Sequence, residues 1–206
     1  MRLVEDAKLL LANSRFPSAC SLAALSIEES GKASILRRIA CAATEDDARK
    51  LWREYRSHTA KNVLWLLPQL VGQGARRLHD FAELFDEKSD HPHVLDQVKQ
   101  IGFYTDCLGS AHWSEPSSVI DEKLAHTLVA TAALLARDKE VTASEIDLWI
   151  KVVGPHLNGT HADAQAALQE WYTQMQYLGL APAGDNSMTT FIFDGIQSAG
   201  ANVRGC

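Results

Sequence analysis

An arginine and a histidine with four residues between them, Arg53 and His58, are the side chains in this sequence best suited to a chemical reaction. When RNA is cleaved without a metal ion, the 2′-hydroxyl attacks the adjacent phosphate. A histidine with an ordinary pKa of about 6.5 can move that proton at neutral pH. An arginine can hold the phosphate and stabilise the charge that develops on it. The pair fits a site for RNA cleavage, and the competing interpretation is a basic helix face exposed to solvent.

The spacing of this pair does not establish a site. On a continuous helix, five residues leave the two side chains about 140° apart, so a joint role requires the reach of arginine, a local distortion or a second subunit. His58 instead shares a helix face with Lys61 and Asn62, and Arg53 shares one with Arg56. A chain of this composition contains about one such pair by chance, so spacing alone favours the solvent-exposed face.

Three charged residues in the segment IEESGK, Glu28, Glu29 and Lys32, form a second group. Glu29 falls on the apolar stripe that includes Leu22 and Leu36, and a carboxylate near a core needs a partner. The Arg–His pair and Lys32 are its natural partners. We therefore expect either a carboxylate that orients the Arg–His pair or a structural ion pair between two helices.

The elements that must position these residues are predicted to be helices, and the sequence is typical of an all-α protein. Pro17 opens one helix, Thr44 caps the next, and Thr142 with Glu145 forms a capping box. Gly31, in mid-helix, permits the close approach of another helix. The helices are expected near residues 4–13, 17–42, 44–68, 75–85, 93–103, 121–139, 142–154 and 160–178.

Two segments interrupt or follow the helices. Gly, Pro and Ser residues predict a loop or short hairpin insertion near 104–118. We expect a single helical domain over residues 1–180, which includes additional C-terminal helices, and a tail over 181–206 that is loosely docked or mobile. Within that tail, only the segment TTFIF is strand-like.

Composition limits the possible functions. The 206 residues are 46% hydrophobic and 22% charged, as in a globular protein, and the net charge of −6 means that any RNA site must be local. The N-terminus lacks a signal-like apolar run, and no segment approaches the roughly 20 apolar residues that span a bilayer. The four cysteines are far apart, which is typical of reduced thiols. We expect a cytoplasmic protein that contacts no membrane.

Metal binding is not expected. His91 and His93 flank a proline, but two ligands without a matching acid or thiol are better explained as a solvated turn. Phosphate-binding glycine loops and serine-hydrolase motifs are also missing. We therefore expect no metal ion and no other cofactor.

Three sequence blocks in this order resemble the AbiV-type abortive-infection family of the HEPN superfamily: DAKLLLANSRFPSACSLAALSIEESGK, LWREYRSHTAKN and QVKQIGFYTDCLGSAHWSEPSSVI. The resemblance covers roughly residues 3–155. It implies a HEPN-like helical bundle in bacterial antiphage defence, usually dimeric. In many HEPN relatives an Arg-x(4–6)-His motif forms a ribonuclease site at the dimer interface.

The resemblance assigns Arg53 and His58 as the catalytic pair, with Arg56, Lys61 and Asn62 as neighbours that bind phosphate or orient the site. Many relatives carry Asn, Asp or His directly after the arginine, where this chain has Glu54.

Two functions are compatible with the sequence. The first is an endoribonuclease that acts as a homodimer, arrests translation and responds to a phage-encoded activator. The second is a non-catalytic helical module that binds a phage protein or an antitoxin-like partner.

Overall fold

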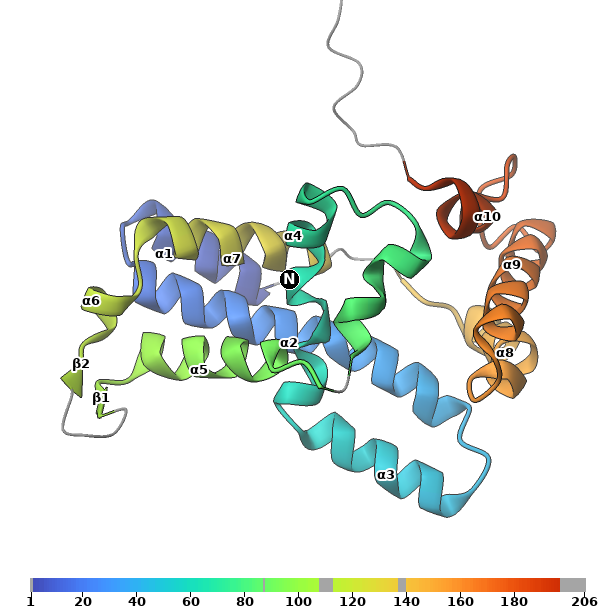
Figure 1. The fold of residues 1–206 in the computed structure, drawn as a ribbon, viewed down its shortest axis with the longest axis horizontal. Coiled ribbons are helices and arrows are strands. Elements are labelled where there is room, and N and C mark those ends of the chain that lie inside the picture. The colour runs from blue at the N-terminus through green and yellow to red at the C-terminus, as the bar shows by residue number, and fades with distance from the viewer. Residues whose placement is uncertain (1, 87, 108–112, 137–139, 197–206) are drawn as a thin grey trace, which may run out of the picture.

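The computed structural model describes residues 2–86, 88–107, 113–136 and 140–196, and it confirms an all-α fold (Figure 1). The main bundle contains four helices: α1 (Arg2–Ala12), α2 (Phe16–Ala40), α5 (His91–Phe103) and α7 (Glu122–Leu135). Helix α2 runs through the middle, with α1 and α7 on one side and α5 on the other (Figure 1). Helix α3 (Glu45–Arg56) contacts the C-terminal half of α2.

Small side chains on α2 allow its neighbours to approach closely. Ala19, Ala23 and Ala24 are buried in the core, which also includes Leu95 of α5 and Leu128 of α7. Because α2 is surrounded by other helices, the residues buried along it are mainly alanine, serine and glycine rather than a single stripe of leucines.

Helix starts follow the local signals in the sequence. Pro17 lies in the first turn of α2, and the Thr44 side chain accepts a hydrogen bond from the Asp47 backbone N–H at the start of α3. The capping box of Thr142 and Glu145 opens α8 (Ala143–Val152). These three predictions are confirmed, because capping depends on residues adjacent in the chain.

The helix predicted over 44–68 is wrong in its second half. Helix α3 ends at Arg56, and three short helical segments follow: η1 (Thr59–Lys61), η2 (Val63–Leu66) and α4 (Leu67–Gly72). Ser57 leaves the helix with φ −74° and ψ 133°, and its hydroxyl accepts a hydrogen bond from the Ala60 N–H at 3.3 Å. A serine side chain that bonds the backbone locally competes with helix continuation. Arg53 and His58 therefore do not share one helix.

The connection between α4 and α5 contains a 3₁₀ helix, η3 (Leu78–Phe85), within the predicted helix 75–85. The hairpin prediction is confirmed by β1 (Asp106–Cys107) and β2 (Trp113–Ser114), which pair antiparallel. The short helix α6 (Pro116–Val119) then leads into α7. Residues 108–112 of the predicted insertion lie outside the described residues.

The C-terminal helices form a second hydrophobic cluster, centred on Leu148, Val153, Trp171 and Met175. It is built from α8 and α9 (His161–Tyr177), with η4 (Gly154–His156) between them. The guanidinium of Arg37 on α2 lies 5.3 Å from the centre of the Trp149 ring, so this cluster contacts the end of α2.

The segment TTFIF is helical, so its strand prediction is wrong. It lies in α10 (Ser187–Thr189) and the π-helical turn η5 (Thr190–Asp194). The Asn186 side chain caps this segment, and Phe191 packs 5.9 Å from the Phe81 ring of η3. Capping and tertiary contact outweigh the β preference of these residues. Residues 181–196 of the predicted tail are described and 197–206 are not.

Within the described ranges, no helix combines the length and apolar character needed to cross a bilayer.

Candidate functional site

A buried carboxylate, Glu28 of α2, is at the centre of the site. Its Oε1 accepts hydrogen bonds from Lys61 Nζ at 2.9 Å and from His58 Nδ1 at 2.7 Å. Its Oε2 accepts one from Lys99 Nζ at 3.0 Å, and Lys99 also pairs with Asp96 at 2.7 Å. The group links α2, the turn after α3 and helix α5.

The charges in this group stabilise one another. Burial disfavours the charged carboxylate, but hydrogen bonds from Lys61, Lys99 and His58 outweigh burial and hold the pKa of Glu28 below its ordinary value. Burial likewise disfavours the Lys99 ammonium, but its bonds to Asp96 and Glu28 raise its pKa. Both groups are therefore ionised at neutral pH.

Gly31 determines how closely the segment from His58 to Lys61, which we call the His58 turn, approaches α2. A Cβ atom on Gly31 would lie 2.0 Å from the carbonyl oxygen of Lys61, a distance that no side chain can accept. Gly31 is one turn along α2 from Glu28. Both residues therefore contact η1: Gly31 lets the Lys61 backbone approach, and Glu28 binds the Lys61 side chain. The predicted close approach at Gly31 is confirmed, but the neighbour is the short 3₁₀ segment η1 and not a packed α-helix.

His58 is held at one nitrogen and open at the other. Its side chain is 61% exposed, and Nδ1 is bound to Glu28. A carboxylate that accepts from Nδ1 favours the tautomer with its proton there, which leaves Nε2 with a lone pair. Among the described residues, Nε2 has no hydrogen-bond partner. This arrangement suits a general base.

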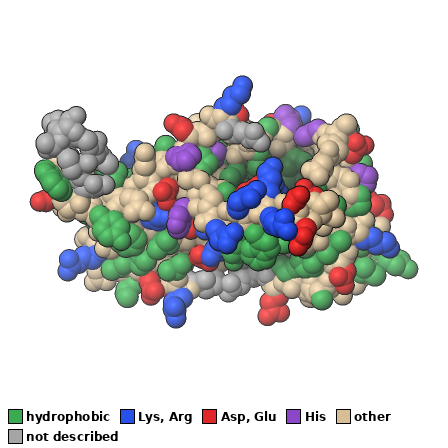
Figure 2. Space-filling model, turned by 90° about the horizontal axis from the view of Figure 1, so that it is seen from below, with side chains coloured by type: hydrophobic (Ala, Val, Ile, Leu, Met, Phe, Trp, Pro, Cys, Tyr) green, Lys and Arg blue, Asp and Glu red, His purple; other side chains and the backbone are tan. Residues whose placement is uncertain are grey.

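The arginines lie on the outer face of α3. Arg49, Arg53 and Arg56 line a shallow hollow of about 410 Å³ with Trp52, which confirms that Arg53 and Arg56 share a face. Arg49 is paired with two acidic residues at the start of α3. Arg53 and Arg56 have no ion-pair partner in the described part of the chain. Lys and Arg side chains gather on the face seen in Figure 2.

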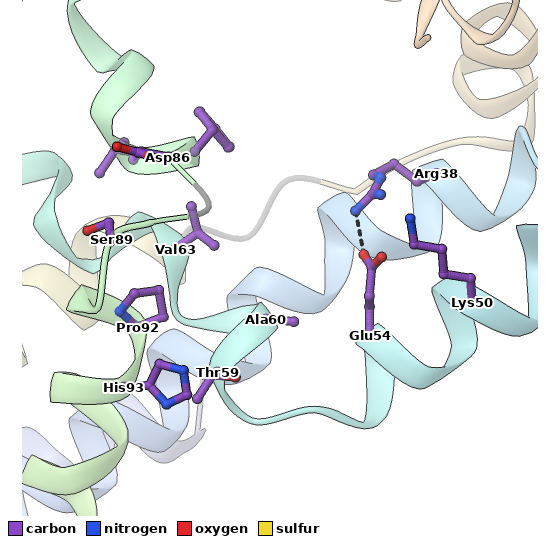
Figure 3. A pocket seen from close by; sticks show the side chains of 12 residues that line it. Arg38, Lys50, Glu54, Thr59, Ala60, Val63, Asp86, Ser89, Pro92 and His93 are labelled. Atoms are coloured by element: carbon purple, nitrogen blue, oxygen red, sulfur yellow. Dashed lines mark hydrogen bonds and ion pairs between the residues drawn. The ribbon is translucent and has the colours of Figure 1, made fainter.

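Glu54 points away from the arginine hollow. Its carboxylate pairs with Arg38 of α2 at 2.6 Å, and both residues line a separate pocket (Figure 3). The negative charge that follows Arg53 in the sequence is thus directed to another face and paired with a guanidinium. A phosphate beside Arg53 would not face an unpaired carboxylate at Glu54.

The structure corrects the predicted placement of Glu29. Its side chain is 53% exposed and pairs with Lys32 at 2.7 Å, so the carboxylate near the core is Glu28. Leu36, on the same predicted stripe, is exposed as well. Leu22 packs against the core, but from Glu29 to Leu36 the stripe faces outward, because the neighbours of α2 cover the small residues beside it. Lys32 also lies 5.5 Å from the Tyr55 ring, which connects α2 to α3.

Lys61 and Asn62 are buried, which favours an orienting role over direct phosphate contact. Lys61 is bound to Glu28, and the Asn62 side chain donates to the Pro92 carbonyl at 3.1 Å. Within one chain, Arg53 and His58 make no contact with each other among the described interactions.

Sequence reasoning missed Asp96 and Lys99. The one available signal was their separation of three residues, which places an acid and a base together on one face of α5. Such pairs are common on exposed helix surfaces, so the spacing did not indicate a buried site. The pair is instead turned inward. It supports Glu28, with the Lys99 side chain only 7% exposed.

Glu28, His58 and Asp96 are the described residues that could hold a metal ion, because their ligand atoms lie within 4.8 Å of one another. The ammonium groups of Lys61 and Lys99 already occupy the Glu28 oxygens at 2.9 and 3.0 Å. A divalent cation would have to displace both, so the donor set fits a metal poorly.

The turn predicted around His91 is not solvated at that residue. His91 is buried, and its Nε2 lies 3.1 Å from the Val63 carbonyl oxygen. Its own carbonyl accepts a hydrogen bond from the Trp65 indole at 2.9 Å. His91 thus fixes the segment after His58 against the start of α5, while His93 is exposed.

A helical bundle that presents arginines and a carboxylate-bound histidine on neighbouring segments has the fold and the residue types expected of the HEPN class. Comparison with known families matches residues 1–137 to AbiV, a HEPN family, and the chain belongs to that family. The membership indicates a HEPN-type function connected with abortive infection. No curated protein and no solved structure gave a match.

Proposed function

We propose that this protein is a metal-independent endoribonuclease of antiphage defence, which acts in the cytoplasm and cleaves RNA with Arg53 and His58. The observation that carries the proposal is the state of His58. One ring nitrogen is bound to a buried carboxylate and the other is exposed without a partner among the described residues.

The chemistry follows from these positions. His58 Nε2 takes the proton from the RNA 2′-hydroxyl, whose oxygen attacks the adjacent phosphorus. The bond to the 5′-oxygen breaks, that oxygen takes up a proton from water, and the products carry a 2′,3′-cyclic phosphate and a 5′-hydroxyl. Arg53 and Arg56 stabilise the negative charge on the five-coordinate phosphorus. Glu28 orients the imidazole and stabilises its positive form after proton transfer, as carboxylates do beside catalytic histidines.

The proposed enzyme is a homodimer. Arg53 and His58 do not meet within one chain, so a second copy would complete the site. The outer face of α3 is available for this contact: Trp52 is 44% exposed and lines the same hollow as Arg53 and Arg56, which have no ion-pair partner in the described ranges. Exposed aromatic and arginine side chains are enriched in protein interfaces.

RNA cleavage by the protein would arrest translation in an infected cell, with a phage-encoded protein as activator. No membrane contact is part of this function. A protein toxic to its own cell requires such control, which makes the activator part of the same proposal.

The test is incubation of the purified protein with total RNA in EDTA. We expect cleavage in EDTA, and we expect it to be lost in both Arg53→Ala and His58→Ala while the helical circular dichroism stays unchanged. Cleavage that persists in either variant would disprove the assignment of that residue. If the wild-type protein is inactive even with phage lysate as a source of activator, a non-catalytic binding module is the better description.

A further inference from the structure

A second pocket is lined by residues that adjoin the proposed catalytic pair in the sequence. It has a volume of about 400 Å³ and lies between α3, the η1 turn and the segment from η3 to the start of α5 (Figure 3). Thr59 and Ala60, the two residues after His58, form one wall, and Glu54, the residue after Arg53, lies on another. The backbone of the pair is thus connected to the pocket through residues one or two positions away, whereas the arginine hollow lies on another side of α3.

The composition of the pocket suits a nucleotide base. Ala60, Val63 and Pro92 supply apolar walls. Phe85 also lines the pocket and is 66% exposed. Aromatic side chains with exposed faces are the usual stacking partners of bases in single-stranded RNA.

A positively charged side chain, Lys50, lines the side of the pocket formed by α3. Lys50 is exposed and has no ion-pair partner in the described part of the chain, whereas the neighbouring Arg38 is already paired with Glu54. Lys50 lies one turn before Glu54 on the same helix. Its ammonium group is therefore available to a phosphate attached to a nucleotide whose base enters the pocket.

We propose that this pocket, which we call the base pocket, binds the base of the RNA nucleotide next to the scissile phosphate. Phe85 stacks on that base, and Lys50 contacts its phosphate. This inference rests on the proposed ribonuclease function and deepens it, because it specifies single-stranded RNA as the substrate and gives the enzyme a position where one base is read. A free nucleotide offers the same chemistry and is distinguished by the experiment below.

The experiment measures binding of a labelled, single-stranded RNA with 2′-O-methyl groups, which cannot be cleaved, by fluorescence anisotropy. The full chain carries His58→Ala throughout. Phe85→Ala and Lys50→Ala are the test variants. The matched controls are Phe103→Ala, at the opposite end of α5, and Lys151→Ala, on α8. All four positions are exposed, so the variants are expected to fold.

Loss of one stacked base should weaken RNA binding about 5- to 150-fold in Phe85→Ala. Lys50→Ala should weaken it and reduce the slope of log affinity against log salt by about 0.7, the value for one phosphate contact on a single strand. Neither control should change the affinity. Titration with 5′-AMP should show much weaker binding than the RNA.

The inference is overturned if the starting protein binds no RNA, or if Phe85→Ala binds it as tightly as Phe103→Ala does. Binding of 5′-AMP that depends on Phe85, together with RNA binding that does not, would reassign the base pocket to a free nucleotide. The two proposals fail separately. RNA binding that requires Phe85, in a protein whose wild-type form cleaves nothing, overturns only the ribonuclease; cleavage that needs Arg53 and His58 but not Phe85 overturns only the base pocket.

Discussion

Replacing Glu28 by glutamine tests whether one buried carboxylate holds the His58 turn against the bundle. The substitution preserves size and one acceptor oxygen but removes the charge. Lys99 would retain Asp96 as a partner at 2.7 Å. Lys61, only 5% exposed, would lose its only acidic partner among the described residues. The variant thus leaves one buried ammonium group without a counter-charge.

The expected loss in the free energy of unfolding is about 3–5 kcal/mol, the usual effect of removing one partner from a buried ion pair. For a chain of this size, that loss corresponds to a fall in melting temperature of about 6–20 °C. The matched control is Glu29→Gln, the next residue along α2. Glu29 is 53% exposed and, among the described residues, pairs only with Lys32, so its loss should change the stability by less than about 0.5 kcal/mol.

The assay is urea unfolding followed by circular dichroism. A double variant adds Lys61→Met, which removes the unpaired ammonium, and it should recover part of the stability lost in Glu28→Gln. Equal stability of Glu28→Gln and Glu29→Gln would show that the Glu28 charge does not stabilise the fold. The same would follow if the double variant lost the sum of the stabilities lost in Glu28→Gln and Lys61→Met.

The stabilisation by Glu28 should depend on pH. The pKa of Glu28 is lowered from 4.5 in the folded protein, so the stability it contributes is complete above that ordinary value and is lost as the pH falls through the lower folded pKa. The stability difference between wild type and Glu28→Gln should therefore be constant near neutral pH and shrink below 4.5. A difference that stays the same in acid would show that Glu28 acts by shape and not by charge.

Three further predictions concern the residues around this carboxylate. Gly31→Ala should destabilise the protein by about 1–3 kcal/mol in urea unfolding, because its Cβ would overlap the Lys61 carbonyl, whereas Gly72→Ala, with open space around it, should have little effect. Glu54→Gln should leave RNA cleavage within about threefold of wild type, because its carboxylate faces Arg38; a rise of about tenfold or more would mean that it opposes phosphate at the site. His58→Ala should lower the cleavage rate by about 10²- to 10⁴-fold in single-turnover assays, with unfolding in urea little changed because the ring is largely exposed. An unfolded His58→Ala protein would indicate a structural histidine instead.

The sequence predicted those parts of the fold that depend on neighbouring residues. The starts at Pro17, Thr44 and Thr142 are set by capping atoms within one turn, so they could be identified without the structure. The end of α3 could not. The periodicity of apolar residues continues past Arg56, but Ser57 and the contacts of the next turn with α2 break the helix. Those contacts join residues about 30 positions apart in the chain.

The sequence identified most residues of the site but did not predict how they are arranged. Arg53, Arg56 and His58 are exposed, and Glu28 is bound to His58. The choice of Glu29 as the carboxylate near the core was wrong, because a one-residue step on a helix turns a side chain by about 100° and only packing shows which one faces inward. The Lys99–Asp96 pair comes from α5, and no local pattern connects it to Glu28.

A catalytic site shared between two copies is tested most directly by RNA cleavage by a mixture of two inactive variants, Arg53→Ala and His58→Ala, after subunit exchange. If Arg53 of one copy acts with His58 of the other, half of the dimers in an equal mixture are mixed and each holds one intact site. Each variant alone should be inactive, and the mixture should recover roughly a quarter of the wild-type rate. A mixture as inactive as its components, under conditions in which wild-type protein cleaves RNA, would contradict a site shared between two copies.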